Sequence, residues 1–350
     1  KKKLPDTKID FKKLKKIKIE DALIKVLSSA NHSNKNWITS QYDQMVMCDT
    51  AQKSGADAAI IRIHGKEKAI AVSVDSSANY CKAHPLTGGK QIVCENWRNL
   101  ISVGAKPVAI TNCLNFGNPE NPEIMGEFAE CLIGIKEACE FLKYPVVSGN
   151  VSFYNGTNKK NIAPTPVIGG IGLISKFKKS FGHQFQDDNS AILLIGKTFG
   201  HLGQSVFLDE VYSIVEGQPP EVNLINEKNN GENVLDLIKN DLVKSVHDIS
   251  SGGLIITLAE MSMGSDYGVL VNRPKKLLNL IEYFFGEDQS RYVVEINKNN
   301  LEKVEKILKN NNIFYENIGS TQKDFFEIQG ELKIDTKELY KINNQWYNNY

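Results

Sequence analysis

Three residues that could take part in chemistry fall within one short run, Val146-Val147-Ser148-Gly149-Asn150-Val151-Ser152-Phe153-Tyr154-Asn155. Gly149 lets the main chain approach a ligand closely and take a positive φ. Asn150 offers a neutral oxygen, which suits a hard cation such as Mg²⁺. The hydroxyl of Ser152 follows two residues later, so in an extended segment both side chains point to the same side. A Gly-Asn turn between two strands is the alternative, and this run taken alone favours the turn.

The elements around this run are predicted from periodicity. An apolar helix over 122–142 stops before Pro145, and Val146-Val147 indicate a short buried strand. A buried strand is expected over 107–111, and it is followed by a polar loop, 112–119, that begins with Asn112. A polar loop is expected over 155–161, and a strand over 165–174 is so dense in glycine that it indicates close backbone approach or a bulge.

The segment before these elements contains two helices and a hairpin. Amphipathic helices are expected over 19–27 and 35–47, and strands over 57–63 and 68–74 are joined by a hairpin turn. Asp75 ends the second strand, where it is either a metal or ligand residue or the cap of a helix or turn. Gly88-Gly89 open a helix over 92–103, where ordinary capping is favoured over anion binding.

A second α/β segment begins near residue 190. Strands are expected over 191–196, 243–246, 268–271, 291–296, 314–318 and 325–328, and helices over 233–239, 254–261, 276–285 and 301–308. His247-Asp248 follows one strand and suggests a catalytic dyad. The stronger interpretation is that Asp248 or Ser250 caps the next helix, because the side chains of sequence neighbours diverge.

Composition excludes several classes of protein. The 350-residue chain is 41% hydrophobic and 24% charged, and its formal net charge of +1 gives no case for nucleic-acid binding. Because no apolar run is long enough to span a bilayer and no signal peptide is evident, we expect a cytoplasmic protein that does not enter a membrane. The six cysteines form no CxxC pair and no His cluster accompanies them, so we expect buried free thiols and no zinc site. The chain lacks an initiator Met, so we expect a fragment or a processed piece.

Several motifs occur together in one order. They are Tyr80-Cys81, Gly88-Gly89-Lys90, Trp97-Arg98-Asn99-Leu100, Leu114-Asn115-Phe116-Gly117-Asn118-Pro119-Glu120, Ser148-Gly149-Asn150-Val151-Ser152, His247-Asp248-Ile249-Ser250-Ser251-Gly252-Gly253-Leu254 and Phe285-Gly286-Glu287 with Arg291. The combination resembles the large synthetase subunit of phosphoribosylformylglycinamidine synthase, in its short bacterial form. This resemblance extends from about Tyr42 to Val294.

The resemblance implies a fold class and a domain division. We expect an α/β (α+β) chain that forms one aminoimidazole-ribonucleotide-synthetase-like unit, the C-terminal one of a tandem pair. The expected parts are a linker or arm over 1–17, an N-terminal α/β subdomain over 18–176 on the nucleotide and interface side, a C-terminal α/β subdomain over 190–335, and a tail over 336–350.

The resemblance also implies a reaction, the ATP-dependent amidation of formylglycinamide ribonucleotide in de novo purine biosynthesis. ATP phosphorylates the amide oxygen, and ammonia then displaces phosphate, with Mg²⁺ neutralising phosphate charge. By motif, Asn112 and Gly149 are expected to contact ATP, Asn150 to bind Mg²⁺ and Ser152 to contact the ribonucleotide. The family usually has Asp at the position of Asn112, so we expect weaker or altered nucleotide binding here.

No catalytic residue is expected in this chain. The family's catalytic histidines, its ATP-contacting lysine and its acidic Mg²⁺ ligands lie in the first unit, and no counterpart of those motifs is present. The expected partners are therefore the N-terminal half of the synthetase subunit, a glutaminase subunit and a small bridging subunit. The alternative is a non-catalytic half that binds nucleotide or acts as a scaffold. A small kinase of the same superfamily is disfavoured by the Asn-Phe-Gly-Asn-Pro-Glu stretch.

Overall fold

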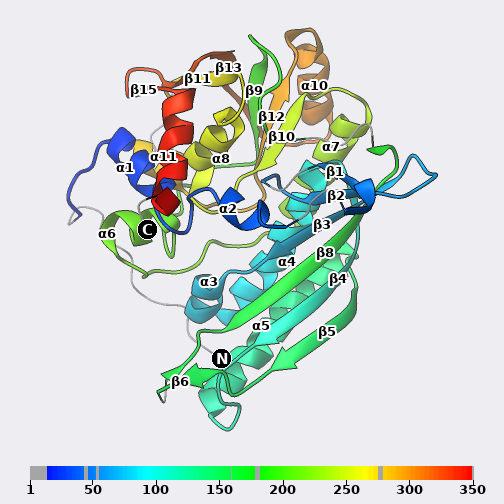
Figure 1. Cartoon of the computed structure of the whole chain (residues 1–350), viewed down its shortest axis with the longest axis vertical. Coiled ribbons are helices and arrows are strands. Elements are labelled where there is room, and N and C mark those ends of the chain that lie inside the picture. Colours follow the sequence, from blue (N-terminus) through cyan, green and yellow to red (C-terminus); the bar gives the residue numbers. More distant parts are fainter. Residues whose placement is uncertain are drawn as a thin grey trace.

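Two β-sheets and the helices between and around them make up the computed structural model, which describes residues 14–42, 46–52, 55–158, 160–177, 182–274 and 279–348 (Figure 1). The first sheet has the order β1-β2-β3-β8-β4-β5, and it is antiparallel except for the parallel pair β4 and β5. Its strands are β1 (Thr50–Gln52), β2 (Ala59–Arg62), β3 (Ala69–Asp75), β8 (Thr165–Ile174), β4 (Lys106–Asn115) and β5 (Val146–Ser152).

One face of this first sheet is covered by helices α3 (Ala78–Ala83), α4 (Pro85–Ser102) and α5 (Pro122–Leu142). The other face carries no helix of the described residues and lies toward the viewer in Figure 1. We call it the open face. Its apolar side chains include Ile61, Val74, Ile171 and Leu173, whose exposed fractions lie between 38% and 68%. An exposed apolar surface of this kind is typical of an interaction site.

The second sheet has the order β10-β12-β9-β13-β11-β14-β15. Its strands are β9 (Ala191–Ile195), β10 (Ser245–Asp248), β11 (Tyr267–Val271), β12 (Tyr292–Ile296), β13 (Tyr315–Lys323), β14 (Phe325–Ile328) and β15 (Leu332–Asp335). The helices packed around it are α1 (Ile19–Leu27), α6 (Val206–Tyr212), α7 (Leu224–Lys239), α8 (Gly253–Ser262), α9 (Leu280–Phe285), α10 (Lys298–Asn310) and α11 (Thr336–Asn348).

Two buried cores hold these layers together. One joins α4 and α5 to α7, α10 and one side of the second sheet, so the two halves of the chain share apolar contacts. The other lies on the opposite side of the second sheet and includes residues of α1, α6, α8, α9 and α11. The N-terminal helix α1 therefore packs with the second subdomain, although the sequence places it with the first. No described helix has the combined length and hydropathy that a membrane crossing requires.

Several predicted elements are confirmed, namely the helices 19–27 and 122–142, the hairpin of β2 and β3, and the glycine-rich strand β8. The predicted helix over 35–47 is wrong, because α2 covers only Asn36–Thr39 and Met47, in the short helix η2 (Val46–Cys48), has a φ of 57°. Residues 43–45 lie outside the described residues. The expected tail over 336–350 is helical as far as Asn348, and the expected loop over 155–161 contains a small hairpin, β6 (Gly156–Thr157) and β7 (Lys160–Asn161).

The Gly88-Gly89 pair does not open a helix, since both residues lie inside α4, which begins at Pro85. A Cβ on Gly88 would come within 2.5 Å of the backbone nitrogen of Cys81, and a Cβ on Gly89 would strike the carbonyl oxygen of Cys131. The glycines therefore allow α4 to pack closely on α3 and α5. The alternative of an anion site at these glycines is wrong, because they do not lie at the N-terminus of a helix.

Candidate nucleotide and metal site

Asn112 and Gly149 stand opposite each other in the parallel pair of strands β4 and β5. Strand β4 continues to Asn115, so Asn112 lies in a strand and not in the predicted polar loop. A Cβ on residue 149 would overlap the amide oxygen of Asn112. Gly149 does not have a positive φ, so that part of the expectation is wrong. The close approach of the Asn112 side chain is the reason for glycine that the structure shows.

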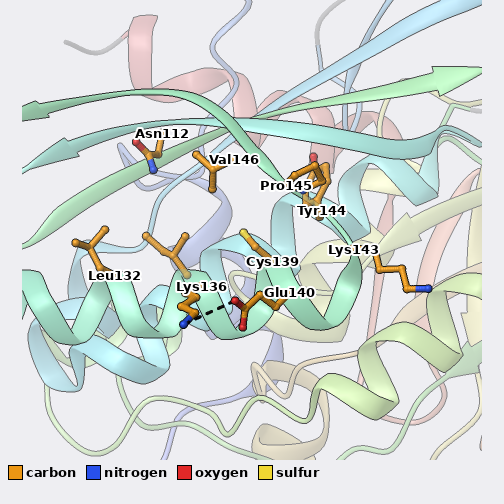
Figure 2. A pocket seen from close by; sticks show the side chains of 10 residues that line it. Asn112, Leu132, Lys136, Cys139, Glu140, Lys143, Tyr144, Pro145 and Val146 are labelled. Carbon is orange, nitrogen blue, oxygen red and sulfur yellow. Dashed lines mark ion pairs between the residues drawn. The ribbon is translucent and has the colours of Figure 1, made fainter.

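A cavity of about 630 Å³ separates these strands from α5, and Asn112 lies on its wall. Figure 2 shows Leu132, Cys139 and other side chains of α5 across the cavity from Asn112 and Val146. The remaining lining residues are Ile135, Lys136, Glu140, Lys143, Tyr144 and Pro145. A mostly apolar cavity with a few polar groups at its edge is typical of a small-molecule site, and its size falls in the usual range.

Asn150 and Ser152 lie on the other side of the same strand, beside Cys113 and Asn115 of β4. The predicted alternation is confirmed, because both side chains point to the open face. The amide nitrogen of Asn150 is 3.9 Å from the Cys113 sulfur, which leaves the amide oxygen facing away from it. The turn interpretation is wrong, since Gly149 and Asn150 lie inside strand β5.

The Ser152 hydroxyl is held by the residue that ends this segment. It donates to the Asn155 amide oxygen at 3.3 Å, and the Asn155 amide nitrogen donates to the Phe116 carbonyl at 3.0 Å. These bonds fix the end of β5 against the end of β4. Ser152 therefore presents its hydroxyl from a rigid strand end.

Strand β5 is an edge strand, and among the described residues it pairs only with β4. The predicted burial of Val146-Val147 is wrong, because these side chains are 45% and 69% exposed. The structure thus brings Asn112 together with Gly149 on the helix side and Asn150 together with Ser152 on the open side. The two pairs lie on opposite faces of the sheet, next to its free edge at β5.

A second polar group lies between the subdomains. Arg98 of α4, which is fully buried, donates to Glu227 at 2.8 Å, to Asp248 at 3.3 Å and to Gln289 at 3.2 Å. Asp248 therefore pairs with Arg98. It does not cap α8, whose N-cap residue is Gly252 with no side-chain cap. Burial raises the pKa of Asp248 to about 7, although Arg98 acts against this shift.

Asp75, at the end of β3, is half-buried and fully engaged by its neighbours. Its carboxylate accepts from Ser73 at 2.8 Å, from Asn96 at 2.7 Å and from Asn99 at 2.7 Å, so the helix-cap interpretation is wrong. Burial, with a contribution from Glu95, raises the pKa of Asp75 to about 7. Three hydrogen bonds from neighbouring side chains thus hold this carboxylate in place.

Sequence reasoning missed the residues of α5 that line the cavity and the ion pair of Arg98 with Glu227. The α5 residues recur at helical spacing, 132, 135, 136 and 139, so one helix face was identifiable, but its partner strand was not. Arg98 lies in the motif Trp97-Arg98-Asn99-Leu100, but a motif does not show what a side chain contacts. Glu227 lies in a helix whose first two turns the sequence prediction omitted.

Comparisons with known proteins identify the fold. The family model described as "AIR synthase related protein, N-terminal domain" matches residues 55–174, and the corresponding C-terminal domain model matches 188–329. A phosphoribosylformylglycinamidine synthase subunit PurL from Pelagibacter ubique is 50% identical over 98% of this chain and 47% of its own length. The subunit of the same name from Rhodopseudomonas palustris is 44% identical over 95% of this chain and 45% of its own length.

Solved structures show the same fold at low sequence identity. T. maritima PurL complexed with FGAR has a TM-score of 0.74 at 14% identity, over 93% of this chain and 54% of that one. AaThiL complexed with AMPPCP and TMP has a TM-score of 0.59 at 16% identity, over 85% of this chain and 93% of that one. The chain spans about half the length of the curated relatives it matches. The resemblance expected from the motifs is confirmed, and the chain belongs to the AIR synthase related family, of which it contains one N-terminal and one C-terminal domain.

Proposed function

We propose that this chain is one half of an ATP-dependent carbon–nitrogen ligase that converts formylglycinamide ribonucleotide to its amidine in de novo purine biosynthesis. The relatives with 44% and 50% identity are named as subunits of this synthase, and related solved structures are titled as complexes with FGAR, ADP and ATP. In this proposal the half is the C-terminal one, and the N-terminal half supplies the catalytic side chains.

The observation that carries the proposal is the arrangement around the free edge of β5. The cavity behind Asn112 suits a purine base, because it is lined mainly by apolar side chains and has an amide at its edge. The unpaired edge of β5 offers backbone groups beside Gly149. A nucleotide that reaches over this edge would bring its phosphates toward Asn150 and Ser152 on the open face.

Mg²⁺ fits this site only if other groups supply most of its ligands. Asn150 offers one amide oxygen, and Mg²⁺ takes oxygen ligands with near-octahedral geometry. The neighbouring side chains on the open face are Cys113 and Asn115, which carry no charge. Asn150 would thus hold the ion together with phosphate oxygens, water and acidic groups of the missing half, and the ion would neutralise phosphate charge.

The open face suits the partner half. The apolar residues Val74 and Ile171 remain 68% and 46% exposed, and they lie on the side of the sheet that no described helix covers. Covering this face would also enclose Asn150 and Ser152 between two units. Association with a glutaminase subunit and a small bridging subunit belongs to the same proposal, since one related solved structure is titled PurLQS from Thermotoga maritima.

A thermal-shift titration with Mg·ATP and Mg·ADP tests the nucleotide site. A ligand that binds only the folded state raises the melting temperature, and the proposal expects a Mg²⁺-dependent shift that Asn150→Ala abolishes. The titration is run on the chain alone and on the chain co-expressed with the N-terminal half. No nucleotide-dependent shift in either preparation would contradict the nucleotide site.

A non-catalytic half is the second candidate function. It is favoured by the amide at position 112 and by the absence of the first unit's motifs from this sequence. Amidation of formylglycinamide ribonucleotide by the co-expressed halves, with ammonia as the nitrogen donor, separates the two candidates. Nucleotide binding without any amidation would favour the non-catalytic half.

A further inference from the structure

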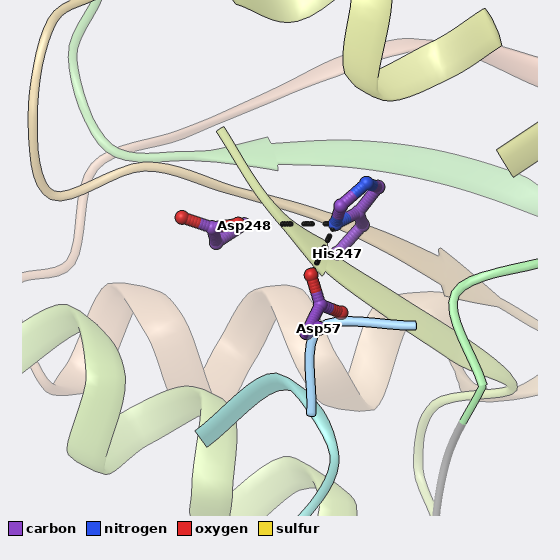
Figure 3. Close-up of side chains that lie close together, drawn as sticks. All are labelled: Asp57, His247 and Asp248. Atoms are coloured by element: carbon purple, nitrogen blue, oxygen red, sulfur yellow. Dashed lines mark ion pairs between the residues drawn. The ribbon is translucent and has the colours of Figure 1, made fainter. Parts of the chain in front are cut away.

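His247 of β10 lies in a group of ligand-type side chains between the two subdomains (Figure 3). Its Nδ1 is 2.6 Å from Oδ1 of Asp57, which precedes β2, and 3.8 Å from Oδ1 of Asp248. The two carboxylates approach Nδ1 from different directions. The side chains of Asp57 and Asp248 are each only 2% exposed.

The two nitrogens of the ring are used differently. Nε2 makes a well-aligned hydrogen bond of 3.1 Å with Glu260 of α8. Nδ1 has no hydrogen-bond partner, although the Asp57 oxygen is only 2.6 Å away, so the short contact lacks the alignment of a hydrogen bond. Nδ1 is thus the ring nitrogen that is left for another partner, and a carboxylate oxygen lies beside it.

The surroundings contain further unsatisfied acceptors. Oδ2 of Asp57 is buried without a hydrogen-bond partner, and so is Nδ1 of His183, whose ring centroid is 5.0 Å from that of His247. Both residues line a cavity of about 560 Å³ that also reaches Glu260. Buried polar groups without partners are uncommon in native proteins and call for a ligand, a water or an ion.

The charge balance of the group also favours a cation. The buried Asp57 and Asp248 and the partly exposed Glu260 face a single imidazole, and Arg98 shares its charge between Asp248 and the buried Glu227. Burying carboxylates is costly unless they are paired or bind a metal. A divalent cation at Nδ1 would neutralise this excess.

We propose that Asp57, His247 and Asp248 bind a divalent transition-metal ion such as Zn²⁺, which links the two subdomains. One imidazole and two carboxylates form a nitrogen and oxygen ligand set that suits Zn²⁺ or Mn²⁺. The bond from Nε2 to Glu260 is the carboxylate contact that commonly orients a metal-bound histidine and leaves its other nitrogen unprotonated. His183 is placed to supply a further nitrogen from the cavity wall.

A proton competes with the metal at this site. A histidine nitrogen must be unprotonated to bind a metal ion, so protons and the metal compete for the same atom. The metal affinity should therefore rise as the pH increases.

The experiment is a titration of the metal-free chain with Co²⁺ and Zn²⁺. We expect one equivalent of Co²⁺ to give visible d–d absorption without a thiolate charge-transfer band, Zn²⁺ to displace it, and Mg²⁺ at the same concentration to have no effect. His247→Gln and Asp57→Asn should weaken binding by about tenfold or more, the range typical of lost metal ligands and their supports. His32→Gln is the matched control, because His32 lines the same cavity outside the proposed ligand set.

Three outcomes would overturn the proposal. One is the absence of a Co²⁺ spectrum at pH 8, which would leave His247 as an imidazolium held between carboxylates. Another is a spectrum that His247→Gln and Asp57→Asn leave unchanged, and the third is a thiolate band that places the metal at a cysteine. Because His247→Gln could fail to fold, Asp57→Asn and the rise of affinity with pH provide independent readouts.

Discussion

The amide oxygen of Asn112 occupies the position that a Cβ on Gly149 would take, so these two residues of neighbouring strands depend on each other. Any larger residue at 149 must displace Asn112 from the cavity wall. The glycine thus fixes where the cavity places its amide. The same contact explains why glycine is needed without a positive φ.

Gly149→Ala should weaken nucleotide binding by roughly tenfold, because one hydrogen bond of the displaced Asn112 is lost. The melting temperature without ligand should change little, since Asn112 can swing into the cavity. Calorimetric titration with Mg·ADP measures the effect in whichever preparation binds nucleotide. The control is the double variant with Asn112→Ala, which leaves room for the new methyl group. Unchanged affinity in Gly149→Ala would contradict the role of this contact.

Gly89→Ala should destabilise the fold by about 1–3 kcal/mol, the cost of inserting an atom into a packed contact. The new Cβ would strike the backbone of Cys131, and backbone cannot rotate away. Gly126→Ala is the matched control, because Gly126 is also helical and has nothing within 4 Å of the added atom. That control should be neutral or stabilising by up to about 1 kcal/mol. Urea unfolding of both variants makes the comparison, and equal effects would show that α4 and α5 can separate without cost.

Most of the fold could be predicted from local patterns. Helix α5 has a proline at its start, an apolar stripe and a proline after its end, and β8 has a regular alternation, so their bounds follow from the sequence. The glycines at 88 and 89 show where such reasoning fails. A Gly-Gly pair indicates a turn by local rules, but here the neighbouring helices determine its conformation.

The sequence predicts which residues belong to the candidate site, but it does not predict the cavity that they line. The positions of Asn150 and Ser152 on one side of a strand follow from period two, whereas the cavity behind Asn112 depends on α5 packing across β4 and β5. The contact of Asp57 with His247 joins residues far apart in the sequence. Local propensity carries no information about such a contact, because the contact forms only when the chain topology brings the two residues together.

Ile171→Lys should leave the isolated chain folded but prevent assembly with the N-terminal half. Ile171 is 46% exposed on the open face, so a charge there meets water until a partner covers it. Co-purification of the two halves measures the effect. Ile168→Lys is the contrasting variant, because Ile168 lies in the same strand and is fully buried, so it should destabilise the chain itself by about 3 kcal/mol or more. Assembly that survives Ile171→Lys would exclude this face as the interface.

Arg98→Met should destabilise the chain by about 3–5 kcal/mol, because it leaves Glu227 and Asp248 buried without their cation. Arg273→Met is the control, since Arg273 is 64% exposed and its ion pair with Glu331 should contribute at most about 1 kcal/mol. Denaturant unfolding near pH 7 compares the two variants. A similar small effect in both would show that the buried pair adds nothing beyond a surface pair.

Asp75 should make the protein less stable as the pH rises. Its pKa is raised from 3.8 in the unfolded chain to about 7 in the folded one, chiefly by burial. The folded state therefore holds this proton more tightly, and the stability it contributes is complete below about pH 4 and is lost as the pH rises through about 7. Asp75→Asn should flatten the fall in the free energy of unfolding between pH 4 and pH 8 by ~2 kcal/mol. Denaturant unfolding across this range measures the slope, with Asp188→Asn at the surface as the control. An equal slope in Asp75→Asn and the parent chain would place the titrating proton elsewhere, with His247, whose raised pKa acts in the same direction, as the next residue to substitute.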